Sequence, residues 1–392
     1  MDPFMDFIPY SCQQITDEDI EAVVMALRSE YLTQGPIGPA FEAAFAKHHQ
    51  VENAVAVSNA TAGLHIACLA LGVGPDSRVW TSPNTFLASA NCALYCGASI
   101  DFVDIDPDTR NMSVAALAAK LELAAESGTL PCVVIPVDFA GLPADLKEIR
   151  ALADQYGFRI LQDASHAAGA SYLGAPVGSK YADASVFSFH AVKIITTAEG
   201  GMVTTNDGAV ARKLQLLRAH GMTRETTEME HAPEGAWYYE QQVLGFNYRL
   251  TELQAALGLS QLQRIEDLQQ QRVVMADRYD QLLENLPLRL PPRQHDRVSS
   301  WHLYAIEIDA DRTPVQRTDV FRQMREAKIG VNVHYIPVHL QPYYQRLGFN
   351  PGDFPAAEQY YRQTISLPLF PAMTKPQQER VVGVLRQALV TA

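Results

Sequence analysis

Three short segments of the chain place polar residues directly after apolar, strand-like runs, and the first of them is Ser58–Gly63. This segment opens a helix-like stretch, and its small side chains let backbone N–H groups approach an anion. A helix N-terminus adds about half a positive charge at the same place. An ordinary N-cap by Asn59 or Thr61 explains these residues equally well. The chain contains neither a GxxxxGK(S/T) loop nor a GxGxxG motif, so ATP and NAD lack their usual sequence support.

The second and third segments contribute Asp163 and Lys193. Asp163 ends an apolar run, where a strand would deliver its carboxylate into a crevice, and a buried carboxylate requires a partner. That partner is either an arginine or the protonated ring nitrogen of a cofactor, and a helix N-cap is the simpler role for Asp163 taken alone. Lys193 lies between two strand-like segments, either as a surface lysine or as an amine with a lowered pKa, suited to Schiff-base chemistry.

Taken together, these residues match the needs of one cofactor. Pyridoxal 5′-phosphate (PLP) requires an amine to bind its aldehyde, an acid to keep its pyridine nitrogen protonated and a site for its phosphate. Lys193 and Asp163 supply the amine and the acid, and Ser58–Gly63 with Ser188 supplies the phosphate site. Phe86 is a candidate aromatic face over the cofactor ring, and its alternative role is that of a core phenylalanine.

Seven short apolar runs alternate with helix-like stretches and would position these residues. The runs are Ala54–Val57, Arg78–Thr81, Ile100–Asp104, Cys132–Asp138, Ile160–Asp163, Ser185–Ser188 and Met202–Thr205. The helix-like stretches include Ala60–Leu71, Thr85–Tyr95, Val114–Glu126 and Asp145–Tyr156. This alternation predicts an α/β fold with a mainly parallel seven-stranded sheet covered on both faces. Ligands of such folds collect at the carboxyl ends of the strands, where the polar residues are found.

The last third of the chain has a different pattern. A proline-free stretch from Thr251 to about Asn285 predicts one long helix that ends before Pro287. It is followed by two strand-like runs, Trp301–Ile308 and Ile329–His334, and by a closing helix over Lys375–Leu389. We therefore predict a large domain over residues 1–250 and a smaller α+β domain over residues 251–392.

The composition restricts the classes of function. The 392 residues include 31 Lys and Arg against 44 Asp and Glu, a net charge of −13, which argues against a nucleic-acid or anionic-membrane binder. No apolar run approaches the ~20 residues of a membrane-spanning helix. The first residues lack the basic and apolar regions of a secretory signal, and Met5 is a second candidate start. Five cysteines without a Cys-x-x-Cys pair predict reduced thiols, no metal site and a cytoplasmic protein.

The sequence as a whole resembles the DegT/DnrJ/EryC1/StrS family of sugar-nucleotide aminotransferases. The similarity spans nearly the whole chain. It rests on residues 31–36 (YLTQGP), 58–63 (SNATAG), 163–169 (DASHAAG), 188–201 (SFHAVKIITTAEGG), 244–251 (LGFNYRLT) and 333–337 (VHYIP). The resemblance implies the fold of type I PLP-dependent transferases, PLP as the cofactor and a homodimer with a shared active site.

The resemblance also implies roles for single residues. Lys193 and Asp163 would be the catalytic residues, with Lys193 bonded to the cofactor aldehyde and Asp163 on its pyridine nitrogen. The further cofactor-binding residues would be Ala60, Thr61, Phe86, His166, Ser188 and Asn247, the last reaching in from the second subunit. The substrate-binding residues would be Tyr10, Tyr31, Leu32, Thr33, His334 and Tyr335. Because one branch of the family replaces this lysine with histidine and catalyses dehydration, Lys193 predicts transamination.

Within the family, residues 188–201, 220–222 (HGM) and 256–262 (ALGLSQL) are most similar to one branch. That branch transfers an amino group from glutamate to C4 of UDP-4-keto-6-deoxy-N-acetyl-L-altrosamine in pseudaminic acid biosynthesis. The alternative substrates are UDP-4-keto-6-deoxy-GlcNAc, a dTDP-4-keto-6-deoxyhexose and UDP-4-keto-arabinose. A non-catalytic regulator with the same fold is a further hypothesis, and the presence of Lys193, Asp163 and Ser188 argues against it.

Overall fold

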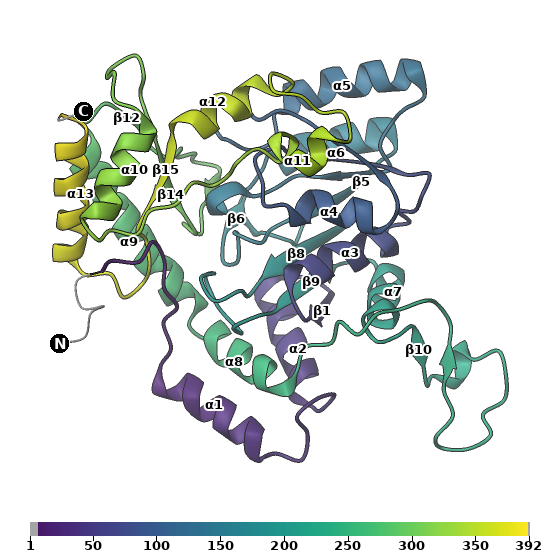
Figure 1. Ribbon diagram of the computed structural model, residues 1–392. Coiled ribbons are helices and arrows are strands. Elements are labelled where there is room, and N and C mark those ends of the chain that lie inside the picture. Colours follow the sequence, from purple (N-terminus) through teal and green to yellow (C-terminus); the bar gives the residue numbers. More distant parts are fainter. Residues whose placement is uncertain (1–6, 391–392) are drawn as a thin grey trace.

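The computed structural model describes residues 7–390, so the candidate start at Met5 lies outside the described residues. A seven-stranded sheet with the order β1-β9-β8-β5-β4-β2-β3 forms its centre (Figure 1). The strands are β1 (Asn53–Val57), β2 (Arg78–Thr81), β3 (Ser99–Phe102), β4 (Val133–Ile135), β5 (Arg159–Asp163), β8 (Ala184–Ser188) and β9 (Gly201–Thr205). All pairings are parallel except those of β9 with its two neighbours. The predicted α/β fold with a mainly parallel sheet is confirmed.

Helices cover both faces of this sheet. One face carries α3 (Ala60–Ala70), α4 (Ala88–Tyr95) and α7 (Gly208–Arg218), and the other carries α2 (Ile37–His49), α5 (Val114–Ser127), α6 (Leu146–Tyr156) and α8 (Glu252–Leu262). Because side chains alternate along a strand, Val133 and Ile135 of β4 pack toward α3 and α4, whereas Val134 packs toward α5 and α6. Burial on both faces explains why the strands are nearly continuous apolar runs.

A smaller unit is built on a three-stranded antiparallel sheet. It contains β12 (Leu288–Arg289), β14 (Tyr304–Ile308) and β15 (Thr364–Leu367), with α9 (Ile265–Leu283), α10 (Arg317–Glu326) and α13 (Lys375–Ala388) packed against them. The long helix predicted from Thr251 was wrong: α8 and α9 are separate helices, because the chain turns at Gln263 and Arg264. The strand predicted over Ile329–His334 was also wrong, since this segment forms only isolated bridges.

Ile8 and residues 338–360 each cross from one unit to the other. Ile8, near the N-terminus, packs in the core of the small unit. Residues 338–360 return to the large unit, where Val338, Tyr344 and Tyr360 join its core. This return includes α11 (Pro342–Gln345) and α12 (Pro355–Gln363). We keep the domain boundary near residue 250 as a proposal, although α8 and residues 297–298 also pack against the large unit.

The remaining elements lie at the periphery. Helix α1 (Asp17–Arg28) packs against α8. Strands β6 (Ser171–Tyr172), β7 (Ala175–Pro176) and β13 (Arg297–Val298) form a small sheet, and β10 (Met222–Thr223) pairs with β11 (Glu240–Gln241). The β10–β11 arm extends away from the rest of the chain (Figure 1). Within residues 7–390, every helix is too short or too polar to span a membrane.

Candidate active site

A cavity of about 770 Å³ opens at the carboxyl ends of the central strands. The large unit lines it with the start of α3, the ends of β5 and β8 and the loop that follows β8, and residues 302 and 332–335 close it from the other side. The predicted site residues that line it are Tyr10, Ala60, Thr61, Phe86, Asp163, His166, Ser188, Lys193, His334 and Tyr335. The structure therefore gathers residues that are up to 325 positions apart in the chain, from Tyr10 to Tyr335.

Lys193 lies on the loop between β8 and β9, and its side chain lines the cavity. Burial lowers the pKa of its amine to about 8, although the Asp163 carboxylate acts in the opposite direction. The loop is held by its own main chain, where the Lys193 N–H donates to the His190 carbonyl at 2.9 Å. The lowered pKa makes a much larger fraction of this amine neutral and nucleophilic at physiological pH than in an ordinary lysine.

Asp163 is the last residue of β5 and is buried at the cavity wall. Its Oδ2 accepts a hydrogen bond from Ser89 Oγ at 2.5 Å, and its Oδ1 accepts one from the Ser165 N–H at 3.1 Å. Thr85 Oγ1 lies 2.7 Å from the same serine oxygen. The carboxylate is thus held in one orientation by two donors. Sequence reasoning missed Ser89, which is the second residue of α4 and gave no local signal.

The N-terminus of α3 forms the anion-binding side of the cavity. Asn59 caps this helix, with its Oδ1 accepting from the Ala62 N–H at 2.8 Å. The N–H groups of the first turn have no partner inside the helix, and Ala60 and Thr61 line the cavity together with Ser188. A Cβ at Gly201 would lie 2.8 Å from the Ala60 nitrogen. Glycine at this position therefore lets β9 pass close beneath the N–H groups.

Histidine and tyrosine side chains cover the opposite wall. The Ala140 N–H donates to His166 Nδ1 at 3.3 Å, and His166 Nε2 lies 3.1 Å from Tyr335 Oη. Burial lowers the pKa of His166 well below its usual value, so the ring is neutral. Because Nδ1 accepts, the ring proton is on Nε2 and is donated to Tyr335 Oη. The Tyr335 hydroxyl therefore keeps its own proton for another acceptor. Because Tyr335 lines the cavity, a ligand in the cavity can be that acceptor.

Two further findings concern the aromatic face and a residue that the sequence did not single out. The Phe86 side chain is 57% exposed and lines the cavity, so its alternative role in the core is wrong. His302 lies in the cavity with its Nε2 3.5 Å from Lys193 Nζ. The only signal for His302 was one histidine at the start of an apolar run.

Four predicted site residues lie outside this cavity in the single chain. Asn247 is exposed at the base of the β10–β11 arm, where it forms a bridge with Ala219. Tyr31, Leu32 and Thr33 are exposed on the loop between α1 and α2. Their predicted roles at the cofactor and the substrate stay predictions.

The residues around the cavity fit PLP. The carboxylate of Asp163 suits a protonated ring nitrogen, and the N-terminus of α3 with Ser188 suits a phosphate. Lys193 supplies an amine for the aldehyde, and the exposed face of Phe86 is available to the ring. These groups belong to a single cavity, which is the arrangement that the cofactor requires.

Comparisons with known proteins agree with this geometry. The DegT/DnrJ/EryC1/StrS aminotransferase family matches residues 13–386. The spore coat polysaccharide biosynthesis protein SpsC of Bacillus subtilis is 39% identical over 383 residues, which cover 97% of this chain and 96% of SpsC.

Solved structures are similar over nearly the whole chain. Helicobacter pylori PseC, an aminotransferase involved in the biosynthesis of pseudoaminic acid, has a TM-score of 0.88 and 31% identity, covering 98% of this chain and 100% of PseC. Spr1654 of Streptococcus pneumoniae in its PMP form has a TM-score of 0.88 and 29% identity, covering 97% of this chain and 98% of that one, and it is also known in a PLP form. These findings confirm the predicted fold, the cofactor PLP and sugar aminotransferase activity. The chain belongs to the DegT/DnrJ/EryC1/StrS family of PLP-dependent sugar aminotransferases.

Proposed function

We propose that this enzyme transfers an amino group from glutamate to C4 of UDP-4-keto-6-deoxy-N-acetyl-L-altrosamine. The product is UDP-4-amino-4,6-dideoxy-N-acetyl-L-altrosamine, a precursor of pseudaminic acid on a bacterial surface glycan. The observation that carries the transamination chemistry is the Lys193 amine, whose pKa is lowered to about 8 in the same cavity as Asp163. The choice of sugar is supported by the branch-specific segments of the sequence and by the similarity to PseC.

The proposed cofactor residues follow from the geometry of the cavity. When bound, PLP supplies an electron sink for the pair released when a Cα–H bond breaks. Asp163, held by Ser89 and Ser165, would keep the pyridine nitrogen protonated. The remaining cofactor contacts are proposed for Ala60 and Thr61 N–H groups and Ser188 at the phosphate, Phe86 over the ring and His166 beside the phenolic oxygen.

Lys193 would carry the proton in both halves of the reaction. As a neutral amine, its Nζ would take the proton from Cα of glutamate in the first half and, as the ammonium, would release it to the C4′ carbon of the cofactor. In the second half, Nζ would take the proton back from that carbon and deliver it to C4 of the sugar. Tyr10, His334 and Tyr335 line the side of the cavity proposed for the sugar nucleotide. His334 is fixed there by Ser366, whose Oγ lies 2.8 Å from its Nδ1.

We further propose a homodimer whose subunits complete each other's sites. Asn247, Tyr31, Leu32 and Thr33 are exposed in the single chain. The chain just before Asn247 also exposes apolar side chains, namely Trp237, Tyr239, Val243 and Leu244, the last of them to 80%. Exposed apolar side chains gathered in this way indicate a protein interface. Mixing Lys193→Ala and Asn247→Ala subunits tests the proposal, because only a mixed dimer can form a site with both residues intact. Activity that does not rise above that of the separate variants would contradict a shared site.

A cytoplasmic location is proposed as well. The support is that the five cysteines are free thiols, as is usual for proteins of a reducing compartment.

The substrate is tested by single-turnover spectroscopy. The enzyme is converted to its pyridoxamine phosphate form with glutamate, freed of the donor, and mixed with UDP-4-keto sugars of altro and gluco configuration in parallel. Fast return of the visible absorbance of the lysine-bound cofactor with the altro sugar alone is the expected result. Fast return with the gluco sugar alone would move the enzyme to another keto sugar while keeping the transaminase chemistry. The identity of 39% to SpsC favours a sugar of a polysaccharide coat as that second candidate.

A further inference from the structure

His302 is a polar side chain of the cavity that the proposed reaction does not use. It is only 3% exposed, and its Nε2 lies 3.5 Å from Lys193 Nζ, at the outer limit of a hydrogen bond. Its Nδ1 is buried without a hydrogen-bond partner among residues 7–390. Catalytic hydrogen bonds are often long before ligands bind. Within the cavity this ring therefore meets the lysine amine, and its centroid lies 4.4 Å from that of the His166 ring.

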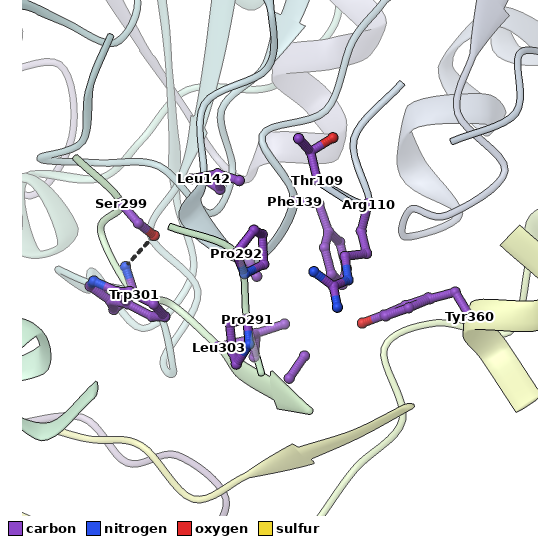
Figure 2. A pocket seen from close by; sticks show the side chains of 12 residues that line it. Thr109, Arg110, Phe139, Leu142, Pro291, Pro292, Ser299, Trp301, Leu303 and Tyr360 are labelled. Atoms are coloured by element: carbon purple, nitrogen blue, oxygen red, sulfur yellow. Dashed lines mark hydrogen bonds between the residues drawn. The ribbon is translucent and has the colours of Figure 1, made fainter. Parts of the chain in front are cut away.

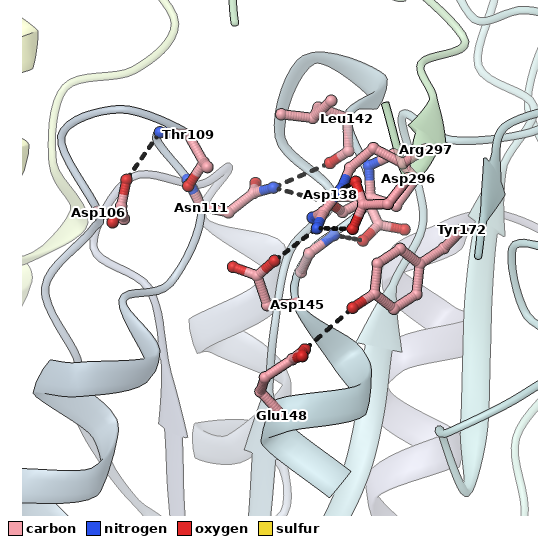
Figure 3. A network of polar contacts seen from close by, with 12 residues as sticks. Asp106, Thr109, Asn111, Asp138, Leu142, Asp145, Glu148, Tyr172, Asp296 and Arg297 are labelled. Atoms are coloured by element: carbon pink, nitrogen blue, oxygen red, sulfur yellow. Dashed lines mark hydrogen bonds and ion pairs between the residues drawn. The ribbon is translucent and has the colours of Figure 1, made fainter. Parts of the chain in front are cut away.

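His302 belongs to residues 297–303, a segment that is fastened to the large unit at its start. Figure 3 shows Arg297 among the acidic side chains and carbonyl groups that hold it. Its Nη1 donates to the Pro143 carbonyl at 2.7 Å, and its Nη2 forms an ion pair with Asp145 at 2.7 Å. Both partners belong to the loop between β4 and α6 or its end. The segment is thus anchored five residues before His302.

A second set of hydrogen bonds holds the segment on either side of His302. The Ser300 N–H donates to the Gly141 carbonyl at 3.1 Å, and Ser300 Oγ donates to the His166 carbonyl at 2.5 Å. The Leu303 N–H donates to the Ala140 carbonyl at 3.2 Å. A Cβ at Gly141 would lie 2.2 Å from Ser300 Oγ, so this close approach depends on glycine. The main chain at His302 is therefore held from both directions.

The residue before His302 has an unfavourable backbone conformation. Trp301 has φ +54°, in the left-handed region that bulky residues rarely adopt. The Trp301 N–H donates to Ser299 Oγ at 3.1 Å, as Figure 2 shows. The Arg293 guanidinium carbon lies 4.6 Å from the centroid of the Trp301 ring. Such conformations persist only where surrounding contacts enforce them, and they cluster at functional sites. The left-handed conformation of Trp301 directs the next residue, so that the His302 side chain enters the cavity.

Arg272 of α9 supports the same place from behind. It is 1% exposed, and its Nη1 donates to the carbonyl groups of Trp301, His302 and Leu369 at 3.2, 3.4 and 3.1 Å. Burial lowers its pKa to about 10. A buried cation whose hydrogen bonds go to carbonyl groups is costly. The fold nevertheless keeps this buried guanidinium against the main-chain carbonyl groups of Trp301 and His302.

The charge state of His302 follows from its surroundings. The titratable groups that face it or Lys193 are Asp163, His166, His334 and Arg272. Burial, and then the positive charge of Lys193, lower the pKa of His302 well below its usual value, so its ring is neutral. A neutral imidazole with its proton on Nδ1 accepts a hydrogen bond at Nε2.

We propose that His302 is a positioning residue for Lys193, whose amine donates a hydrogen bond to His302 Nε2 whenever it is not bonded to the cofactor. The 297–303 segment and Arg272 hold the imidazole at that position. A freed lysine has a flexible four-carbon stem, and proton transfer requires it to stay near the reacting carbon. The proposal concerns the lysine in the PLP-dependent reaction and is independent of which keto sugar is the substrate.

The test measures the pKa of Lys193 in the pyridoxamine phosphate form of the full-length enzyme, in which this lysine is free. Acetic anhydride labelling of the Lys193 peptide is followed by mass spectrometry as a function of pH. His302→Asn shortens the side chain so that no acceptor reaches the amine. Because a hydrogen bond to the charged form raises a pKa, its loss should lower the Lys193 pKa by about one unit.

His302→Gln is the matched variant, because its amide oxygen reaches the position of Nε2. It should keep the Lys193 pKa within a few tenths of the wild type and keep the pH profile of the half-reaction with glutamate, which His302→Asn shifts to lower pH. Thermal melts identify a variant that does not fold, and His302→Phe then replaces His302→Asn. Identical Lys193 pKa values in the wild type, the Gln variant and the Asn or Phe variant would overturn the proposal. The measurement uses no sugar, so it is separate from a failure of the proposed substrate.

Discussion

Ser89 Oγ donates a hydrogen bond to Asp163 Oδ2 at 2.5 Å, which joins the start of α4 to the end of β5. The serine oxygen is itself 2.7 Å from Thr85 Oγ1. Because this bond is charge-assisted, it is stronger than a bond between neutral groups. It holds the carboxylate in the orientation in which it lines the cavity.

Removal of the Asp163 carboxylate should reduce kcat more than removal of its serine donor. Asp163→Ala is expected to cost about 2.7–4 kcal/mol in the barrier, the scale of one well-placed electrostatic group. Ser89→Ala leaves the Ser165 N–H in place, so its cost in the barrier should stay below the about 1.5–3 kcal/mol that a hydrogen bond to a charged group contributes to stability. Stopped-flow kinetics measure both, with Ser127→Ala at the end of α5 as the control. A loss below tenfold for Asp163→Ala would show that its proposed role is wrong.

Lys193→Ala should bind PLP without a covalent bond and should not turn over. The reason is that no other amine lines the cavity among residues 7–390. Absorbance spectra report the bound cofactor, and chromatography of the sugar nucleotide reports the product. Lys213→Ala, which removes an exposed lysine of α7, should behave as the wild type. Turnover like that of the wild type in Lys193→Ala would end the hypothesis of lysine catalysis.

Gly201→Ala should weaken PLP binding. The new Cβ would lie 2.8 Å from the Ala60 nitrogen, so the N-terminus of α3 must shift, and overpacking of this kind costs about 1–3 kcal/mol. Fluorescence titration of the cofactor-free protein gives the dissociation constant. Gly208→Ala is the matched control, since nothing lies within 4 Å of its added Cβ. Equal affinities for the two variants would contradict the position of the anion site.

Tyr335→Phe should lower kcat/KM for the sugar nucleotide while leaving PLP bound. The change removes the hydroxyl proton that the His166 hydrogen bond leaves available to the cavity, and it leaves the His166 Nε2–H without its acceptor. An unsatisfied buried donor costs about 1–3 kcal/mol, so a modest loss of thermal stability should accompany the kinetic effect. Tyr343→Phe, at an exposed tyrosine of α11, is the control. Unchanged kcat/KM would exclude a substrate contact by the hydroxyl.

His49 should contribute to loss of stability in acid. Burial lowers its pKa from 6.5 to about 3, and its Nδ1 contacts the Val177 carbonyl at 2.8 Å. Between these pH values the unfolded chain binds more protons than the folded chain, so stability falls as the pH falls through this range. The Tm of the wild type minus the Tm of His49→Phe should therefore fall from pH 8 to pH 5. Leu347→Ala, at an exposed residue without a titratable group, should show a constant difference.

The seven strands and the polar residues at their ends could be predicted because burial leaves a direct trace in the sequence. Strands such as β4 and β8 are covered on both faces, so they are short continuous apolar runs. In a mainly parallel sheet their carboxyl ends meet at one edge, which is why Asp163 and Ser188 could be assigned to one site. The smaller unit was less predictable. The turn at Gln263 and Arg264 that separates α8 from α9 contains neither glycine nor proline, the usual local signals of a helix end.

The sequence by itself determined the sheet and the cofactor and predicted Lys193 as the amine that binds it, because the strands, the polar residues at their ends and the family motifs are all short segments of the chain. Only the tertiary structure decided which side chains lie against Lys193 and Asp163. Ser89 lies 74 residues before Asp163, and His302 lies 109 residues after Lys193. The contact of His302 depends on a strained tryptophan and a buried arginine, and the contact of Ser89 depends on the packing of α4 against the sheet. Contacts over such separations arise from packing between elements, and no local pattern of residue types records them.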